Sequence, residues 1–107
     1  MEKTETLGQF EQFVLTAVYL LNGEGYTINV MEKVEELSGR RALIGAIYIS
    51  LDRLHRKGLV SSRISKPTKG RAGKARRVFK VTPAGELALA QAKASAKQLF
   101  DALGDLA

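Results

Sequence analysis

The sequence predicts a mainly α fold with one small β-hairpin. Three observations lead to this fold class: three amphipathic segments with helical spacing before residue 58, two β-prone runs that flank a basic tip, and a last helical segment with heptad spacing. A chain of 107 residues, 45% of them hydrophobic, makes one small globular domain with little margin of stability. We therefore expect it to form a dimer.

The third helical segment, from Arg40 to Val60, is the one around which the chain is organised. Its apolar residues recur at spacings of three and four, which gives the helix one stripe that faces a core. These residues are Ile44, Ile47, Leu51 and Leu54, and the predicted outer face carries Tyr48, Asp52, Arg53, Arg56 and Lys57. Gly58 follows as the left-handed residue that ends a helix. A helix that is anchored in the core and carries basic residues on its outer face is typical of a helix that recognises a binding partner.

Two amphipathic helices are expected before it. The first, from Leu7 to Leu21, has an inner stripe and a second apolar surface that predicts contact with another chain. The inner stripe is Phe10, Phe13, Val14, Ala17, Val18 and Leu21, and the second surface is Leu15, Tyr19 and Leu20. The second helix is expected to start with Thr27 as its N-cap and to end at Gly39. Its predicted buried face is Ile28, Met31, Val34 and Leu37.

Two helices, a short link and a third helix with a basic face are the order of a helix-turn-helix, and a hairpin directly after them is a wing. The strands of this hairpin are expected within residues 59–65 and 76–82. The tip between them carries four bases and no acid, which suits it to follow phosphates or to place an arginine in a narrow minor groove. These bases are Lys66, Lys69, Arg71 and Lys74. The alternative is a surface loop without a partner.

A last helix is expected after Thr82, a good N-cap, and Pro83, which is tolerated in a first helical turn. Its apolar residues follow a heptad seam: Leu89, Ala92, Ala96, Leu99, Leu103 and Leu106. The seam predicts a dimer, formed by pairing with the same helix of a second chain, by packing on that chain's first helix, or by both. The alternative is a helix that packs only within its own chain.

The basic residues are segregated in the middle of the chain. Residues 37–85 contain thirteen Lys or Arg and one acid, whereas the remaining residues contain four bases and ten acids, for a net charge of +6. A patch this unbalanced attracts a polyanion, and double-stranded DNA suits a helix-turn-helix. Two other functions remain open: a winged-helix module that docks an acidic protein partner, and a protein that coats DNA without sequence preference.

Catalysis is not expected of this chain. It has no cysteine, which removes disulfides, thiol catalysis and thiolate metal sites, and its one histidine, His55, lies among charged residues of the third helix. The sequence indicates no acid-base carboxylate pair, metal site or cofactor, and residues 70–74 lack the spacing of a phosphate-binding loop. No apolar run reaches the roughly 20 residues that span a bilayer, and the N-terminus does not read as a signal peptide. We therefore expect a cytoplasmic, nucleoid-associated protein.

Several short motifs, in this order along the chain, carry a resemblance to a known family. They are Leu7 to Glu11 with Leu15, the Gly39-Arg40 link, Gly45 to Tyr48, Leu51 to Leu54, Lys57 to Ser62, the wing from Pro67 to Arg77, and Thr82 to Gly85. Over about residues 7–89 the chain resembles the PadR family of bacterial transcriptional regulators, in its smaller form with a single C-terminal helix. The resemblance implies a winged helix-turn-helix that binds a near-palindromic operator as a homodimer and usually represses transcription. It also implies a division into a DNA-binding domain, residues 1–82, and a C-terminal dimerisation helix, residues 83–107.

The sequence departs from the family pattern at three points. Thr27 stands where the family often has Gly, and Leu43 stands where a Ser often caps the recognition helix. The chain also has none of the tryptophan that lines a ligand pore in some members. The aromatic residues available to line a cavity for a small-molecule effector at the dimer interface are Phe13, Tyr19 and Phe100.

These expectations give individual residues a role. Tyr48 is expected to contact a phosphate or a base edge through its hydroxyl, with a core tyrosine as the alternative. Arg53 is expected to contact DNA, or else to pair with Asp52 or with an acid of the second helix. The other DNA-binding candidates are Arg40, Arg41, Lys69, Arg71 and Lys74. The dimerisation candidates are Leu15, Tyr19, Leu89, Ala92, Ala96, Leu99, Phe100 and Leu103.

Overall fold

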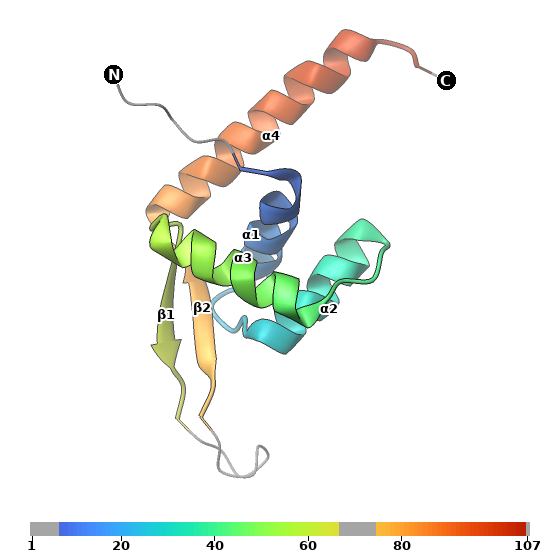
Figure 1. Cartoon of the computed structure of the whole chain (residues 1–107). Coiled ribbons are helices and arrows are strands. Elements are labelled where there is room, and N and C mark those ends of the chain that lie inside the picture. The colour runs from blue at the N-terminus through green and yellow to red at the C-terminus, as the bar shows by residue number, and fades with distance from the viewer. Residues whose placement is uncertain (1–6, 67–74, 107) are drawn as a thin grey trace.

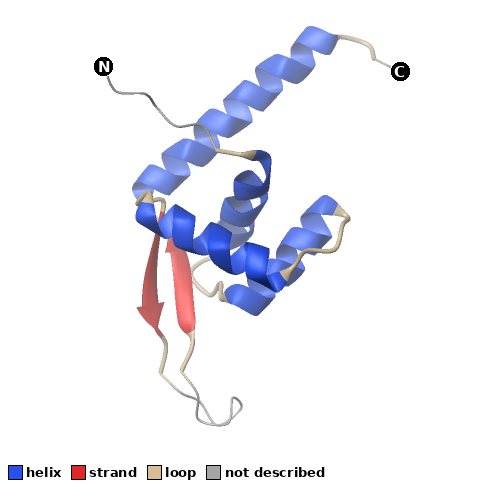
Figure 2. Ribbon diagram, in the orientation of Figure 1, coloured by secondary structure: helices blue, strands red, loops and turns tan. Residues whose placement is uncertain are grey.

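The computed structural model describes residues 7–66 and 75–106 of the chain. The elements are α1 (Gln9–Leu20), α2 (Thr27–Ser38), α3 (Ile44–Arg56), β1 (Val60–Ile64), β2 (Arg77–Val81) and α4 (Pro83–Leu103). In Figure 1, α3 lies across α1 beside α2, the hairpin projects from this body, and α4 runs away from it. The predicted fold class is therefore confirmed, because the described residues form four helices and one two-stranded antiparallel sheet (Figure 2).

The core lies where the first three helices meet the hairpin. Its buried residues are Val14, Leu15, Ala17, Val18, Val30, Val34, Ile47, Leu51, Leu54, Val60, Phe79 and Val81. Leu15 was expected to face a second chain, but it is fully buried and belongs to this core. The reason is that α2, α3 and α4 of the same chain all pack on α1. The other two residues of that surface, Tyr19 and Leu20, are each about half exposed.

The position and orientation of α2 differ from the sequence expectation. Its N-cap is Tyr26, not Thr27, because the Asn29 side chain accepts a hydrogen bond from the Tyr26 N–H at 2.7 Å. Val30 and Val34, one turn apart, form the buried stripe. Ile28 and Leu37, which were expected to be buried, are exposed because α2 turns the Val30 and Val34 line toward α1 and α3.

The expected helix α3 is confirmed, with Ile47, Leu51 and Leu54 fully buried. Ile44 departs from the predicted stripe and is about half exposed, because it is the first residue of the helix and lies at the edge of the core. The end at Gly58 is also confirmed: its φ of 76° is left-handed, and the next N–H, of Leu59, donates to the Leu54 carbonyl at 3.0 Å.

The hairpin pairs β1 with β2 so that Val60 lies opposite Val81 and Ile64 lies opposite Arg77. Contacts beyond the pairing of its two strands attach the hairpin to the helices. The Phe79 N–H donates to the carbonyl oxygen of Gly25, in the turn between α1 and α2, at 2.7 Å. The wing is thus anchored to the helix-turn-helix by a backbone hydrogen bond as well as by the buried Phe79 ring.

Thr82 joins the end of α3 to the start of α4. Its hydroxyl oxygen accepts from the Gly85 N–H at 3.1 Å, which confirms the predicted cap, and its O–H donates to the Gly58 carbonyl at 2.7 Å. Gly85 completes the joint, because a Cβ added there would collide with the backbone oxygen of Leu59. The helix ends at Leu103, before Gly104, so Leu106, which was predicted as the last residue of the heptad seam, lies beyond the helix.

Candidate nucleic-acid interface

Helix α3 presents one face to solvent because its other face is held in the core. Tyr48 and Ile49 are 56% and 58% exposed, while Ile47 beside them is fully buried. The alternative of a core tyrosine at position 48 is thereby excluded. Arg53 is also exposed. Tyr48 and Arg53 are thus both exposed to a partner, on different parts of the outward surface of α3, because they lie five residues apart.

The charged part of α3 contains an ion pair that the sequence did not assign. Asp52 pairs with Arg56 at 2.7 Å across one helical turn, rather than with Arg53. Because the Arg56 side chain is largely exposed, this contact organises two surface side chains and adds little stability. The one acid of the basic segment is therefore neutralised by an adjacent arginine.

The link between α2 and α3 exposes Arg40 and Arg41 beside the start of α3. Its backbone is held from α2, because the Glu35 carboxylate accepts from the Ala42 N–H at 2.8 Å and the Ser38 hydroxyl accepts from the Arg40 N–H at 3.1 Å. Leu43 is the N-cap of α3 and makes no side-chain cap hydrogen bond, as its apolar side chain dictates. These contacts fix the path of the link that carries the two arginines.

Two arginines of the hairpin lie against the start of α2 and were missed as candidates. The Arg76 guanidinium stacks 3.9 Å from the centre of the Tyr26 ring, at the start of α2. Arg77 lies 4.8 Å from the centre of the Phe79 ring and donates to the Ser62 hydroxyl at 3.2 Å. Both arginines line a groove of about 330 Å³ with the first residues of α2. The sequence holds no local signal for this arrangement, because the Tyr26 and Arg76 pair forms only in the fold.

The remaining DNA-binding candidates, Lys69, Arg71 and Lys74, lie outside the described residues. Of the bases that the structure describes in β1, Arg63 faces the turn before α2, where it donates to the Gly23 carbonyl at 3.3 Å and lies 3.9 Å from the Glu24 carboxylate. The hairpin therefore uses one basic side chain to dock on its own domain.

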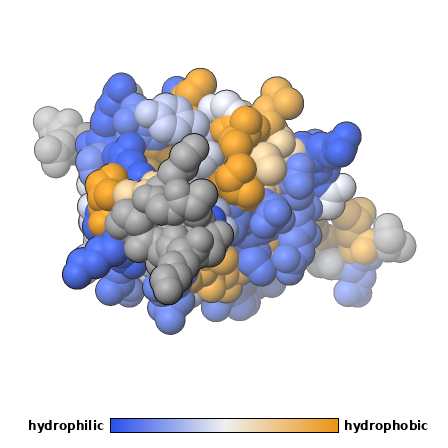
Figure 3. All heavy atoms as spheres, turned by 90° about the horizontal axis from the view of Figure 1, so that it is seen from below, coloured by the Kyte–Doolittle hydropathy of each residue, from blue (hydrophilic) through white to orange (hydrophobic). Residues whose placement is uncertain are grey.

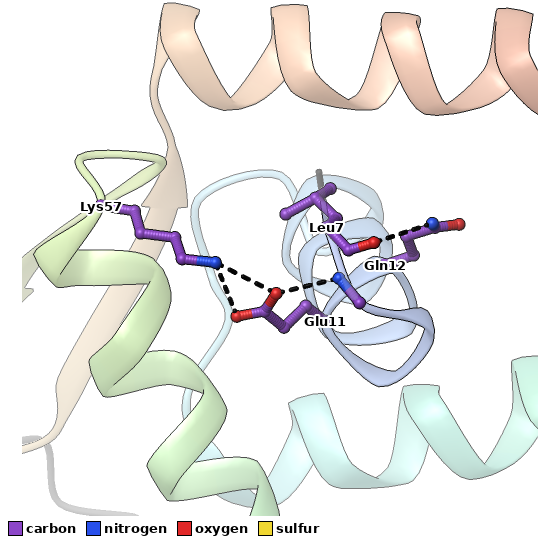
Figure 4. A network of polar contacts seen from close by, with 5 residues as sticks. Leu7, Glu11, Gln12 and Lys57 are labelled. Carbon is purple, nitrogen blue, oxygen red and sulfur yellow. Dashed lines mark hydrogen bonds and ion pairs between the residues drawn. The ribbon is translucent and has the colours of Figure 1, made fainter. Parts of the chain in front are cut away.

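The end of α3 is tied to the start of α1 by a nearly buried ion pair (Figure 4). Lys57 was expected on the outer face, but its ammonium donates to both carboxylate oxygens of Glu11, at 3.1 and 3.2 Å. Glu11 is 7% exposed and also accepts from the Gly8 N–H at 3.0 Å. Burial raises the pKa of Glu11, but the hydrogen bonds from Gly8 and Lys57 outweigh it and lower the pKa below its ordinary value.

The C-terminal half of α4 carries apolar side chains that its own chain does not cover. Leu99, Phe100 and Leu103 are each more than half exposed, whereas Leu89, Ala92 and Ala96 are partly buried. Two of the expected effector-lining residues do not meet within one chain. Phe13 lines a groove of about 490 Å³ between α1 and the link, and Tyr19 lines another of about 400 Å³ beside β2.

The face from which the hairpin projects is a mixed surface, with apolar groups set directly beside polar ones (Figure 3). Within residues 7–66 and 75–106, no cluster of His, Cys, Asp or Glu is arranged to hold a metal ion. No helix in the described part of the chain combines the length and apolar character needed to cross a membrane.

A helix-turn-helix that exposes its third helix beside a basic link, followed by an anchored hairpin, is the winged-helix architecture of DNA-binding regulators. The chain belongs to the transcriptional regulator PadR-like family, whose model matches residues 15–91. The resemblance found in the sequence is thereby confirmed. A comparison with curated protein sequences finds no match.

Solved structures of similar proteins share the fold over most of the chain. A PadR-like transcription factor from Bacteroides fragilis is 25% identical, with a TM-score of 0.76 over 94% of this chain and 91% of its own. A PadR family regulator from Clostridium difficile R20291 is 20% identical, with a TM-score of 0.75 over 90% of this chain and 95% of its own. A PadR-like regulator from Bacillus cereus is 19% identical, with a TM-score of 0.73 over 89% and 87%.

Proposed function

We propose that this protein is a sequence-specific transcriptional repressor and not an enzyme. In this proposal a homodimer binds a near-palindromic operator in the cytoplasm, at the nucleoid. Helix α3 enters the major groove, and the basic wing contacts the flanking backbone or minor groove. The observation that carries the proposal is the exposed face of α3, which is held rigidly by its buried side and lies beside the arginines of the link.

The proposed contacts divide into two kinds. Tyr48 and Arg53 lie on α3 and would meet base edges or the phosphates at the groove wall. Arg40 and Arg41 in the link, and Lys69, Arg71 and Lys74 in the wing, would neutralise phosphates and position the dimer. Arg76 and Arg77 extend this phosphate-binding surface to the start of α2.

The proposed dimer uses residues 83–107, and residues 1–82 form the DNA-binding unit. Leu99, Phe100 and Leu103 are exposed apolar side chains on a helix that projects beyond its own domain (Figure 1). Burying such a surface against a second chain removes it from water, at about 25 cal/mol for each Å² of apolar surface. A two-fold dimer then matches a near-palindromic site.

Fluorescence anisotropy on the DNA upstream of the protein's own gene tests the proposal, with scrambled duplex as competitor and at two salt concentrations. We expect binding that resists the competitor by about 10³-fold or more and weakens steeply as salt rises. Equal competition by scrambled DNA would indicate a coating protein. The absence of salt-sensitive binding to any duplex, including a random-sequence pool, would indicate the protein-contact module instead.

A further inference from the structure

The outward side of α3 is apolar in its first half, which phosphate binding does not explain. Successive residues of a helix are about 100° apart, so Ile49 lies opposite the line formed by Ile47, Leu51 and Leu54. It is therefore the most outward large apolar residue of the helix. We define the apolar end of α3 as four exposed residues: Leu43, Ile44, Tyr48 and Ile49.

Gly45 lies one turn before Ile49 on the same outward side of α3, and its presence inside a helix is unusual. Glycine in a helix lowers its stability relative to alanine, so a helical glycine calls for a reason. No contact among residues 7–66 and 75–106 supplies one: Gly45 is exposed, and a Cβ added to it would meet no atom of this part of the chain within 4 Å. The remaining reason is close approach of an external surface to the backbone of α3 at this point.

The charges around the apolar end indicate which surface that is. Arg40 and Arg41 lie before it in the link, and Arg53 follows it on the helix, where Arg56 is paired with Asp52. A complementary partner is apolar at its centre and anionic on both sides. The floor of the DNA major groove has this form at thymine, because the C5-methyl group projects into a groove bordered by two rows of phosphates.

We propose that Ile49 is a specificity-determining residue that reads thymine. The Ile49 side chain packs on a thymine C5-methyl group in each half-site, and Gly45 lets the first turn of α3 approach the base edges. This inference rests on the proposed function and adds the chemistry of the operator, which carries a thymine at the same position of both half-sites.

Random-site selection with the purified protein supplies the operator, and replacing its thymines by uracil tests the inference. Uracil lacks only the methyl group, so the pairing and the phosphates stay unchanged. We expect one symmetric pair of positions at which the wild-type protein loses about fourfold in affinity per methyl group, or about fifteenfold for both. The Ile49→Ala variant is expected to bind the thymine and uracil versions of that pair equally.

Ile64→Ala is the matched control, because it removes the same side chain from a comparably exposed position on β1. It should keep the full loss on uracil. The inference is overturned if no thymine is sensitive in the wild-type protein, or if Ile49→Ala keeps the loss. Failure of the selection to enrich any sequence is a different result, because it refutes the proposed function itself.

Gly45→Ala provides a second, independent measurement. We expect this variant to melt at a higher temperature than the wild type and yet to bind the selected site about tenfold more weakly. A purely structural role would move stability and affinity in the same direction. Unchanged affinity in the more stable variant would refute close approach at Gly45.

Discussion

Replacing Glu11 by glutamine tests whether the ion pair at the end of α3 stabilises the domain. The carboxylate accepts one hydrogen bond from the Gly8 N–H and two from the Lys57 ammonium, at 3.0 to 3.2 Å. Glutamine has the same shape and can keep the contact to Gly8. It loses the charge, however, and presents an amide donor where the ammonium needs an acceptor.

The size of the effect follows from the burial of the two partners. A hydrogen bond to a charged group contributes about 1.5–3 kcal/mol, and an unpaired buried charge costs more. The Lys57 side chain is one quarter exposed, so its ammonium recovers part of its hydration when the carboxylate is removed. We therefore expect Glu11→Gln to lower the free energy of unfolding by about 2 kcal/mol at pH 7.

The effect has a defined pH dependence. Because the pKa of Glu11 is lower in the folded state than its ordinary value of 4.5, the unfolded chain takes up the proton first as the pH falls. The stabilisation is thus fully present above pH 4.5 and is lost as the pH falls through the folded-state pKa. The difference between wild type and variant should be constant from pH 7 to pH 5.5 and shrink below pH 4.5.

Urea unfolding at several pH values and one protein concentration measures this difference; the concentration is fixed because a dimer's stability depends on it. Glu36→Gln is the matched control. Glu36 makes an ion pair with Lys33 at 3.2 Å, but its side chain is 69% exposed, so its loss should cost less than about 0.5 kcal/mol. An equal cost for both variants, or a difference that persists unchanged at pH 3, would refute the assigned role of Glu11.

Four further outcomes are expected. Gly85→Ala should destabilise the domain by about 3 kcal/mol in urea unfolding, because its Cβ collides with backbone, and a fully stable variant would contradict this. Thr82→Val removes a cap and the bond to Gly58, so melting should fall by roughly 5–10 °C; an unchanged melting temperature would mean that the joint is dispensable. Leu103→Asp should yield a monomer by light scattering, and a persistent dimer would place the interface elsewhere. Arg71→Ala should reduce the slope of log affinity against log salt by about two per dimer, whereas identical binding at every salt concentration would remove the wing from the interface.

The sequence was sufficient to predict elements whose signals are local. The seam of α3 and its end at Gly58 depend on residues within a few turns of each other, as does the cap at Thr82. The hairpin was also predicted, since two β-prone runs flanking a short basic tip have few other ways to pair. In each case the pattern and the chain direction together determine the contact.

Features that depend on how the helices pack could not be predicted in this way. The choice of Val30 over Ile28 for the buried side of α2 is a rotation of the helix, which its neighbours decide. Leu15 looked like an interface residue because the sequence does not reveal which elements of the same chain pack on α1. Likewise Lys57 and Glu11 are 46 residues apart, so neither carries a local sign of the other.

The joint at Thr82 makes α4 a lever on α3. The 21 residues of α4 span about 30 Å, so a rotation of about 10° at the joint displaces its far end by about 5 Å. In the proposed dimer that displacement would move the two α3 helices apart or together. A displacement of about 5 Å exceeds the rise of about 3.4 Å between neighbouring base pairs. In such a dimer, the stiffness of this threonine-bridged turn and the packing of α4 on α1 would together limit how far apart the halves of an operator can lie.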